Sequence, residues 1–143
     1  MQLYEGKNNW DNFGNDQVKA AVLKFDGRNE LSLTFYSSQN DDRCQVVLDW
    51  DEEIKSFREL YEMLYQKKGR QCKLYPDDFR GLMMRGAYSA GGFELTFLKN
   101  YQCVQVVMAL EKANVFWQGV EQMFAAPGEY RLNLGEETSG EAM

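Results

Sequence analysis

The sequence of 143 residues predicts an α+β protein in which two tandem βββα or ββββα repeats form one domain with a pseudo-two-fold axis. The first observation is that Gln-Val-Val-Leu at 45–48 returns as Gln-Val-Val-Met at 105–108. The second is that Leu-Thr-Phe at 33–35 returns unchanged at 95–97. The third is that an amphipathic segment follows each Gln-Val-Val run. Such a repeat predicts antiparallel sheets and one helix in each copy.

The length fits a single domain of residues 1–135, with the two repeats at about 1–68 and 70–135. Residues 136–143 are small and acidic, so we expect a flexible acidic tail. Hydrophobic residues make up 44% of the chain, which is typical of a globular protein. The apolar runs are too short to cross a membrane, and residues 1–10 lack the apolar core of a signal peptide.

Alternating apolar and polar residues predict three strands in the first repeat, at 18–25, 30–36 and 44–50. The sequence Asp-Gly-Arg-Asn at 26–29 predicts a tight turn between the first two strands, because glycine, aspartate and asparagine tolerate positive φ. Residues 37–43 are polar and predict a loop. These are the three strands of the first βββα repeat.

A helix is predicted at 52–66, and Phe57 occupies the same register in it as Trp117 in the second repeat. We expect Asp49 or Asp51 to cap its N-terminus, and a glycine that follows two lysines to end it. Its buried stripe has helical spacing. The stripe consists of Ile54, Phe57, Leu60, Tyr61 and Leu64.

The second repeat has the same order of elements. Strands are predicted at 82–88, 93–98 and 103–110, and a helix at 112–125. A Pro-Gly pair ends this helix, and a last short strand is predicted at 130–134.

Two weaker echoes extend the repeat towards the N-terminus. Leu-Tyr at 3–4 returns at 74–75, and Asn-Phe at 12–13 resembles Asp-Phe at 78–79. These echoes suggest that each repeat begins with an extra strand and is then a ββββα unit.

The three cysteines are Cys44, Cys72 and Cys103, and no Cys-x-x-Cys pair occurs. An odd number without a secretory context predicts reduced thiols, and so a cytoplasmic protein. The chain has no histidine, the commonest general base and transition-metal ligand.

Catalytic motifs are absent from the sequence, since there is neither a Gly-rich phosphate loop nor a Gly-x-Ser-x-Gly segment. The acidic residues at the start of the first helix could hold Mg²⁺ or Ca²⁺, but helix capping explains them more simply. These residues are Asp49, Asp51, Glu52 and Glu53. We therefore predict a protein that is not an enzyme and uses no metal or cofactor.

The net charge of −6 is unevenly distributed along the chain. Residues 1–54 carry five Lys/Arg and eleven Asp/Glu, whereas residues 55–85 carry eight Lys/Arg and four Asp/Glu. The basic middle is either a solvated helix end with its linker or an anion-binding strip in an otherwise negative field.

A ββββα unit with a curved antiparallel sheet resembles the PC4-like and Pur-alpha-like single-stranded nucleic acid binding proteins. PC4-like proteins form a dimer of such units, and Pur-like proteins place two in one chain. The resemblance covers roughly residues 18–66 and 80–125 and is one of pattern, without a diagnostic motif. It is carried by residues 93–97, 105–108 and 113–124, and by 31–36, 44–48 and 54–64.

The sequence departs from this resemblance in its charge. Those families carry basic strands with aromatic residues on the face that meets nucleic acid, whereas the strands of the first repeat lie in the most acidic third of this chain. Because Lys and Arg dominate phosphate binding, the net charge opposes nucleic-acid binding outside the basic middle.

One hypothesis is that the protein binds single-stranded DNA or RNA through a sheet face and the basic middle. The phosphate-binding candidates are Lys67, Lys68, Arg70, Lys73, Arg80 and Arg85. Tyr75 or Phe79 would stack on bases, and Tyr36 and Tyr88 are favoured among further strand aromatics that include Phe25, Phe35, Phe97 and Tyr101.

The alternative is an acidic protein-interaction module, such as an adaptor, an enzyme inhibitor or an accessory protein of a phage or mobile element, that meets a basic partner. Trp50 would be either an aromatic anchor or a core residue. The contact residues would be Asp41, Asp42, Asp49, Trp50, Asp51, Glu52 and Glu53. The chain is a monomer or a homodimer, and the predicted strand at 130–134 offers a sheet edge that could pair across a two-fold axis.

Overall fold

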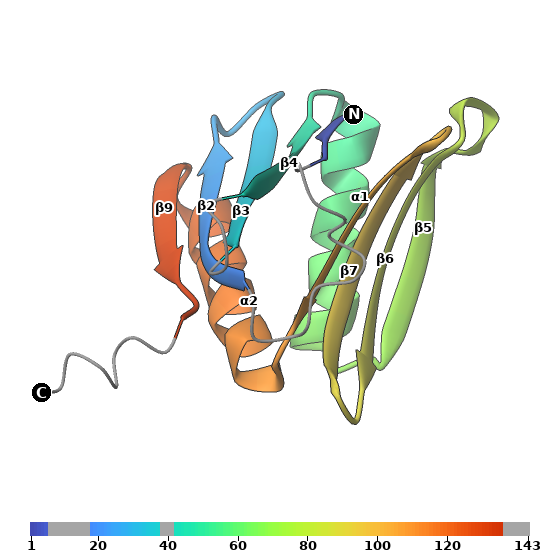
Figure 1. Ribbon diagram of the computed structural model, residues 1–143. Coiled ribbons are helices and arrows are strands. Elements are labelled where there is room, and N and C mark those ends of the chain that lie inside the picture. Colours follow the sequence, from blue (N-terminus) through green and yellow to red (C-terminus); the bar gives the residue numbers. More distant parts are fainter. Residues whose placement is uncertain (6–17, 38–41, 136–143) are drawn as a thin grey trace, which may run out of the picture.

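The computed structural model describes residues 1–5, 18–37 and 42–135, and it contains two antiparallel sheets and two helices (Figure 1). The α+β class and the order of strands and helices predicted from the sequence are confirmed. The elements of the first half are β1 (Gln2–Tyr4), β2 (Val18–Phe25), β3 (Leu31–Ser37), β4 (Arg43–Leu48), α1 (Asp51–Tyr61) and the π-helical turn η2 (Glu62–Gln66). Those of the second half are β5 (Gln71–Asp77), the 3₁₀ turn η3 (Asp78–Arg80), β6 (Leu82–Ser89), β7 (Gly92–Lys99), β8 (Gln102–Met108), α2 (Leu110–Ala125) and β9 (Gly128–Asn133).

Each half contains a meander of three strands followed by a helix. Sheet A has the strand order β1-β4-β3-β2-β9, and sheet B has the order β5-β6-β7-β8. The repeat is visible in the pairing, because Thr34 lies opposite Gln45 in sheet A and Thr96 lies opposite Gln105 in sheet B. In both pairs the glutamine Nε2 donates to the threonine Oγ1, at 3.0 Å and 3.1 Å. The recurring sequences therefore build the same cross-strand contact twice.

The extra strands predicted at the start of each repeat are present, but they occupy different edges. β1 pairs with β4, the last strand of its meander, whereas β5 pairs with β6, the first strand of its own. The position equivalent to β5 is filled in sheet A by β9, which pairs with β2. β9 follows α2 as β5 follows α1, so the last strand of the chain completes the first repeat.

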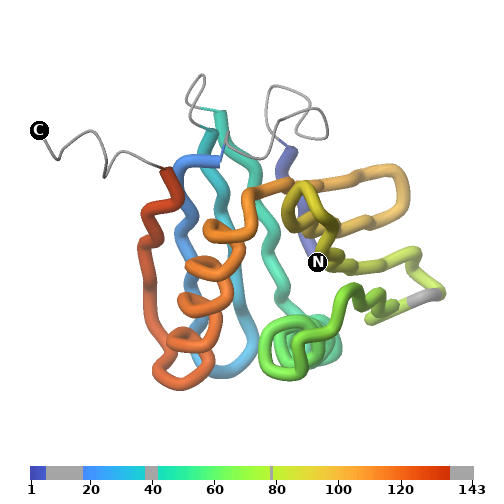
Figure 2. Tube along the Cα trace, turned by 90° about the horizontal axis from the view of Figure 1, so that it is seen from below, coloured from blue at the N-terminus to red at the C-terminus, as the bar shows by residue number. Residues whose placement is uncertain are grey.

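The helices are exchanged between the two halves. α1 follows sheet A but packs on β5 and β6 of sheet B, whereas α2 follows sheet B but packs mainly on β2 and β9 of sheet A and also contacts β7. Figure 2 shows α2, in orange, lying across the blue and red strands of sheet A. Each sheet is thus covered mainly by the helix of the other repeat.

The exchange brings the two repeat-related aromatic residues together. The rings of Phe57 and Trp117 are stacked with their centroids 6.1 Å apart, and both side chains are fully buried. The repeat-related residues of the sheets join them, since Phe97 lies 6.3 Å from Phe57 and Phe35 lies 5.7 Å from Phe116. The predicted stripe of the first helix is buried, which confirms the register assigned from the sequence.

The start of α1 differs from the prediction. Trp50 is the N-cap residue and makes no side-chain capping bond, so neither Asp49 nor Asp51 is the cap. Instead, the Glu53 carboxylate in the first turn accepts the backbone N–H of Asp49 at 3.2 Å. The negative charges of the first turn still complement the helix dipole.

The end of this helix also differs in detail. Lys68, and not the glycine after it, adopts the left-handed conformation, with φ of 58°. Gly69 donates its N–H to the Met63 carbonyl at 2.8 Å, as expected for a residue that closes a helix. A Cβ atom at Gly69 would lie 2.8 Å from that same oxygen. The glycine is therefore required by a close backbone approach.

Several predictions fall on residues that the structure does not describe. They are the echo at 12–13, most of the loop at 37–43 and the tail at 136–143. Asp41 lies in the second of these segments.

The turn predicted at 26–29 is described. Asp26 Oδ1 accepts the backbone N–H groups of Arg28, Asn29 and Glu30. These hydrogen bonds hold the pKa of the Asp26 carboxyl below its usual value.

We predict that Gly69→Ala lowers the free energy of unfolding by about 1–3 kcal/mol, because backbone atoms must move to admit the methyl group. The matched control is Gly91→Ala, since a Cβ atom there meets no atom within 4 Å. The control should leave stability within about 0.5 kcal/mol of the parent protein in urea unfolding. Equal effects of the two substitutions would refute the close approach at Gly69.

Candidate nucleic-acid interface

The outer faces of both sheets, which point away from the helices, consist of cross-strand rows of side chains. In each sheet one row contains the Thr–Gln pair. The other members of the row are the residues that lie directly opposite on the neighbouring strands. In sheet A this row is Arg131–Val22–Thr34–Gln45–Tyr4. In sheet B it is Lys73–Arg85–Thr96–Gln105. Sheet B thus places two cations side by side where sheet A has a cation and a valine.

Two cations of sheet B, Lys73 and Arg85, and Arg70 directly before β5 form what we call the basic face. Arg70 and Lys73 are exposed, and Arg85 is half-buried. Arg85 donates to Glu94 on β7 at 3.0 Å, so one of the three charges is paired. Arg70, Arg85 and Glu94 line a groove of about 500 Å³ at the end of the β6–β7 hairpin.

Exposed aromatic rings gather at the opposite end of sheet B. Tyr75 is 54% exposed, and the side chains of Phe79 and Tyr101 are fully exposed. The backbone N–H of Asn100 donates to the Gly81 carbonyl at 3.3 Å, which holds the β7–β8 turn beside the start of β6. We call Tyr75, Phe79 and Tyr101 the aromatic end of sheet B.

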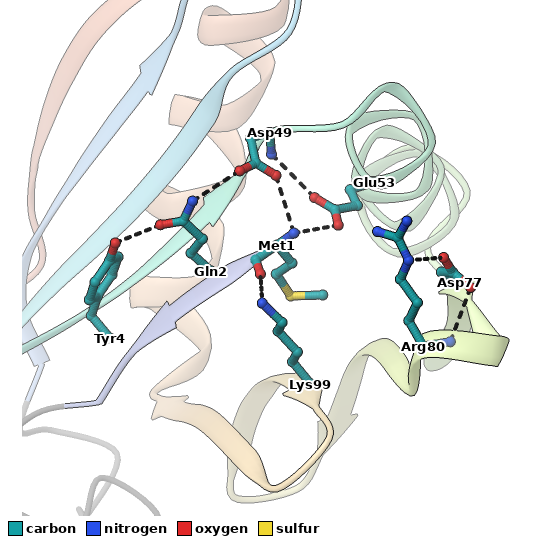
Figure 3. A network of polar contacts seen from close by, with 8 residues as sticks. All are labelled: Met1, Gln2, Tyr4, Asp49, Glu53, Asp77, Arg80 and Lys99. Carbon is teal, nitrogen blue, oxygen red and sulfur yellow. Dashed lines mark hydrogen bonds and ion pairs between the residues drawn. The ribbon is translucent and has the colours of Figure 1, made fainter.

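The remaining cations predicted from the sequence do not lie on the basic face. Lys67 and Lys68 are exposed at the end of η2, and Lys68 Nζ lies 5.2 Å from the centroid of the Tyr65 ring. Arg80 Nε is 3.2 Å from Asp77 Oδ2, a contact drawn in Figure 3. Its guanidinium also lies 5.4 Å from the centroid of the Trp50 ring. Asp77 therefore partly neutralises Arg80.

Of the two tyrosines favoured for stacking, only Tyr88 lies beside the basic face, since its backbone N–H donates to the Arg70 carbonyl at 2.8 Å and it lines the same groove. Tyr36 is half-buried on the outer face of sheet A, opposite Arg43. Tyr88 is half-buried against Phe93, with ring centroids 4.7 Å apart, and its burial raises the pKa of the Tyr88 hydroxyl. Phe25, Phe35 and Phe97 belong to the core.

The acidic residues at the start of α1 serve the fold. Figure 3 shows the Met1 amine between the carboxylates of Asp49, at 3.2 Å, and Glu53. Lys99 of β7 donates to the Met1 carbonyl at 2.8 Å. Burial would raise the pKa of the Asp49 carboxyl, but the hydrogen bond and charge of the Met1 amine outweigh it and lower that pKa. Glu53 is only 1% exposed, so it is not available to a partner.

The rest of the acidic set is divided between interior and surface. Asp42 is buried, and its Oδ1 accepts the backbone N–H of Arg43 at 2.8 Å. Asp51 and Glu52 are exposed, as is Trp50, whose exposed fraction is 40%. The core interpretation of Trp50 is therefore not supported.

Sequence reasoning did not assign Glu94 to the site. Its position follows from register, because Ser89 lies opposite Gly92 across the β6–β7 turn. Counting back from that turn places Glu94 opposite Ala87 and diagonal to Arg85. The signal for this turn is the sequence Ser-Ala-Gly-Gly at 89–92, because glycine favours tight turns.

Within the described residues, no group of three or more His, Cys, Asp or Glu side chains could hold a metal ion. Burial raises the pKa of the Cys44 and Cys72 thiols, which makes them poor nucleophiles at neutral pH. No described helix is long and apolar enough to cross a bilayer.

Comparison with protein-family models, curated proteins and solved structures gives no match. The ββββα pattern that underlies the resemblance to PC4-like and Pur-like proteins is confirmed in both halves. Any functional assignment therefore depends on the geometry of the faces described above.

We predict that Tyr88→Phe makes stability less sensitive to alkaline pH. The folded-state pKa of Tyr88 is raised, so its contribution is fully present below the unfolded-state value of about 10 and is lost as the pH rises through the folded-state value. Urea unfolding between about pH 9 and 11 should show a shallower decline for the variant. The pKa of Tyr61 is also raised, so the stability of both proteins should still fall with pH in this range because of Tyr61.

Proposed function

We propose that the protein is a non-enzymatic binding protein whose basic face and aromatic end bind single-stranded DNA or RNA. The observation that carries this proposal is the arrangement along β5 and β6. Lys73 and Arg85 lie directly opposite each other, and the same sheet ends in exposed Tyr75 and Phe79. Cations that meet phosphates and rings that meet bases are the two components of single-strand binding.

The charge balance supports this location. Residues 67–85 contain six Lys/Arg and two Asp/Glu, a local net charge of +4 in a chain of net charge −6. The acidic surface elsewhere would repel a polyanion and confine it to sheet B. Exposed rings favour single strands, because the bases of a duplex are already stacked on one another.

The path of a bound strand would follow β5. Its seven residues span roughly 20 Å at the rise of a β-strand, so the cations near its start and the rings near its end contact different parts of a ligand. The acidic alternative has fewer groups to use, because Glu53 is buried and Asp49 holds the Met1 amine.

We predict that Lys73→Ala weakens binding of a fluorescein-labelled oligothymidylate and reduces its salt dependence. Removing one phosphate contact should make the slope of log K against log salt shallower by about 0.7. Fluorescence anisotropy from about 50 to 200 mM salt measures both quantities. The control is Lys24→Ala, an exposed lysine on the outer face of sheet A.

Two results would contradict this proposal. One is an unmodified protein that binds neither oligothymidylate nor a mixed-sequence RNA at low salt. The other is an equal loss of affinity in the Lys73 and Lys24 variants, which would show that the charge acts without a defined site.

We predict that Tyr75→Ala costs about 1–3 kcal/mol of binding free energy with little change in salt slope, because it removes stacking and no charge. The control is Tyr4→Ala on the outer face of sheet A, since Tyr4 is 51% exposed and Tyr75 is 54% exposed. The same anisotropy titration measures both variants. An affinity that changes for Tyr4 and not for Tyr75 would move the site to sheet A.

A further inference from the structure

The two sheets have four edge strands, and two of these edges are turned towards each other. β1 is an edge of sheet A and β8 is an edge of sheet B. Gln102 Nε2 at the start of β8 donates to the Leu3 carbonyl at 3.3 Å, and the Cys103 N–H donates to Glu5 at 3.3 Å. These contacts leave little room for another strand.

The third edge, β5, carries features that oppose strand addition. Its register with β6 is interrupted between Leu74 and Asp77, and Pro76 within this interval has no N–H to donate. Lys73 lies in its regular part. Bulges, prolines and lysines are the usual means by which edge strands avoid pairing with other chains.

The fourth edge, β9, is regular and open. It pairs with β2 over six residues without a register shift. Figures 1 and 2 show it at the outer border of sheet A. Among the four edge strands of the described chain, only β9 is both uninterrupted and turned away from the other sheet.

One hydrogen bond shows which residues of β9 bond towards β2 and which bond away from it. The Leu134 N–H donates to the Lys19 carbonyl at 2.8 Å, which makes these two residues a hydrogen-bonded pair. Because such pairs alternate in an antiparallel ladder, Leu132 and Tyr130 also bond towards β2. Glu129 and Arg131 therefore direct their N–H and C=O groups away from the sheet.

We propose that β9 pairs in antiparallel fashion with β9 of a second copy of this chain, across a two-fold axis at Tyr130. In this register Glu129 lies opposite Arg131 of the partner subunit, and Arg131 lies opposite the partner's Glu129. Each of the two pairs exchanges two main-chain hydrogen bonds. Two five-stranded sheets then become one continuous sheet.

Side-chain charge selects this register. Glu129 and Arg131 lie on the same face of β9 and already form an ion pair at 3.0 Å within the strand. The two-fold axis at Tyr130 sets each acid opposite a base. A register centred on Arg131 would instead set two guanidinium groups opposite each other, which destabilises a strand pair. The sequence of this edge is thus complementary to itself.

The test is sedimentation equilibrium of the unmodified chain and of charge variants. We expect a concentration-dependent dimer that Arg131→Glu weakens by at least about tenfold, because each acid then faces an acid. The double variant Glu129→Arg with Arg131→Glu should restore the dissociation constant to within about threefold. Arg43→Glu, an exposed change on the same outer face of sheet A, should have no effect.

A second variant tests the main-chain contact. Arg131→Pro removes an outward N–H without removing a bond to β2, so it should abolish the dimer while leaving the monomer folded. Circular dichroism checks that this variant is folded. If it is not folded, the charge variants alone test whether β9 forms the dimer contact. A monomer at all concentrations, a failed charge-swap rescue, or a dimer that tolerates a folded Arg131→Pro would overturn the proposal. Binding of nucleic acid at sheet B is measured separately and does not enter these outcomes.

Discussion

The contact between Phe57 and Trp117 is the interaction on which both halves of the molecule depend. These residues occupy the same register in the two helices, and they meet because each helix packs on the sheet of the other repeat. Each sheet covers its apolar face mainly with the helix that follows the other sheet in the sequence. Burying a side chain such as Phe57 contributes about 1.5–3 kcal/mol, and here that contribution is gained only when both repeats are folded. The two repeats therefore share a single core.

This shared core explains where the two copies have stayed alike and where they differ. Inner positions are fixed by packing, and the Thr–Gln pairs on the outer faces have kept the same hydrogen bond. Beside these pairs the outer faces are free to change, since exposed residues carry little of the packing energy. Sheet B has Lys73 and Arg85 where sheet A has Arg131 and Val22. The copies thus provide one scaffold with two differently charged faces.

Local patterns in the sequence were sufficient for the central strands and the helices. β2 was predicted with its observed bounds because Ala21, Leu23 and Phe25 alternate with more exposed residues. Local patterns did not predict which edge of a sheet each outer strand occupies. The partner of a short strand such as β1 depends on contacts between residues that are distant in the sequence. The burial of Glu53 depends in the same way on Met1. The pairing of Arg80 with Asp77, three residues earlier, is local, whereas the pairing of Arg85 with Glu94 depends on the register of β6 and β7. Composition located the basic strip but did not show which of its charges are paired.

The place of β9 has a consequence for how such a chain could have arisen. Leu134 at the end of β9 is hydrogen-bonded to Lys19 at the start of β2, so these two ends lie as close as the ends of a hairpin. Traced through space, the order β9-β2-β3-β4-α1-β5-β6-β7-β8-α2 is a closed ring with no intrinsic first strand. An edge strand is followed by a three-strand meander at two equivalent places in this ring, β9 before β2 and β5 before β6. At the second place, η3 connects the two strands. A circular permutation that moved the break from one place to the other would keep every strand pair of the ring. In this fold, the order of the strands along the chain can therefore change while the arrangement of the strands in space stays the same.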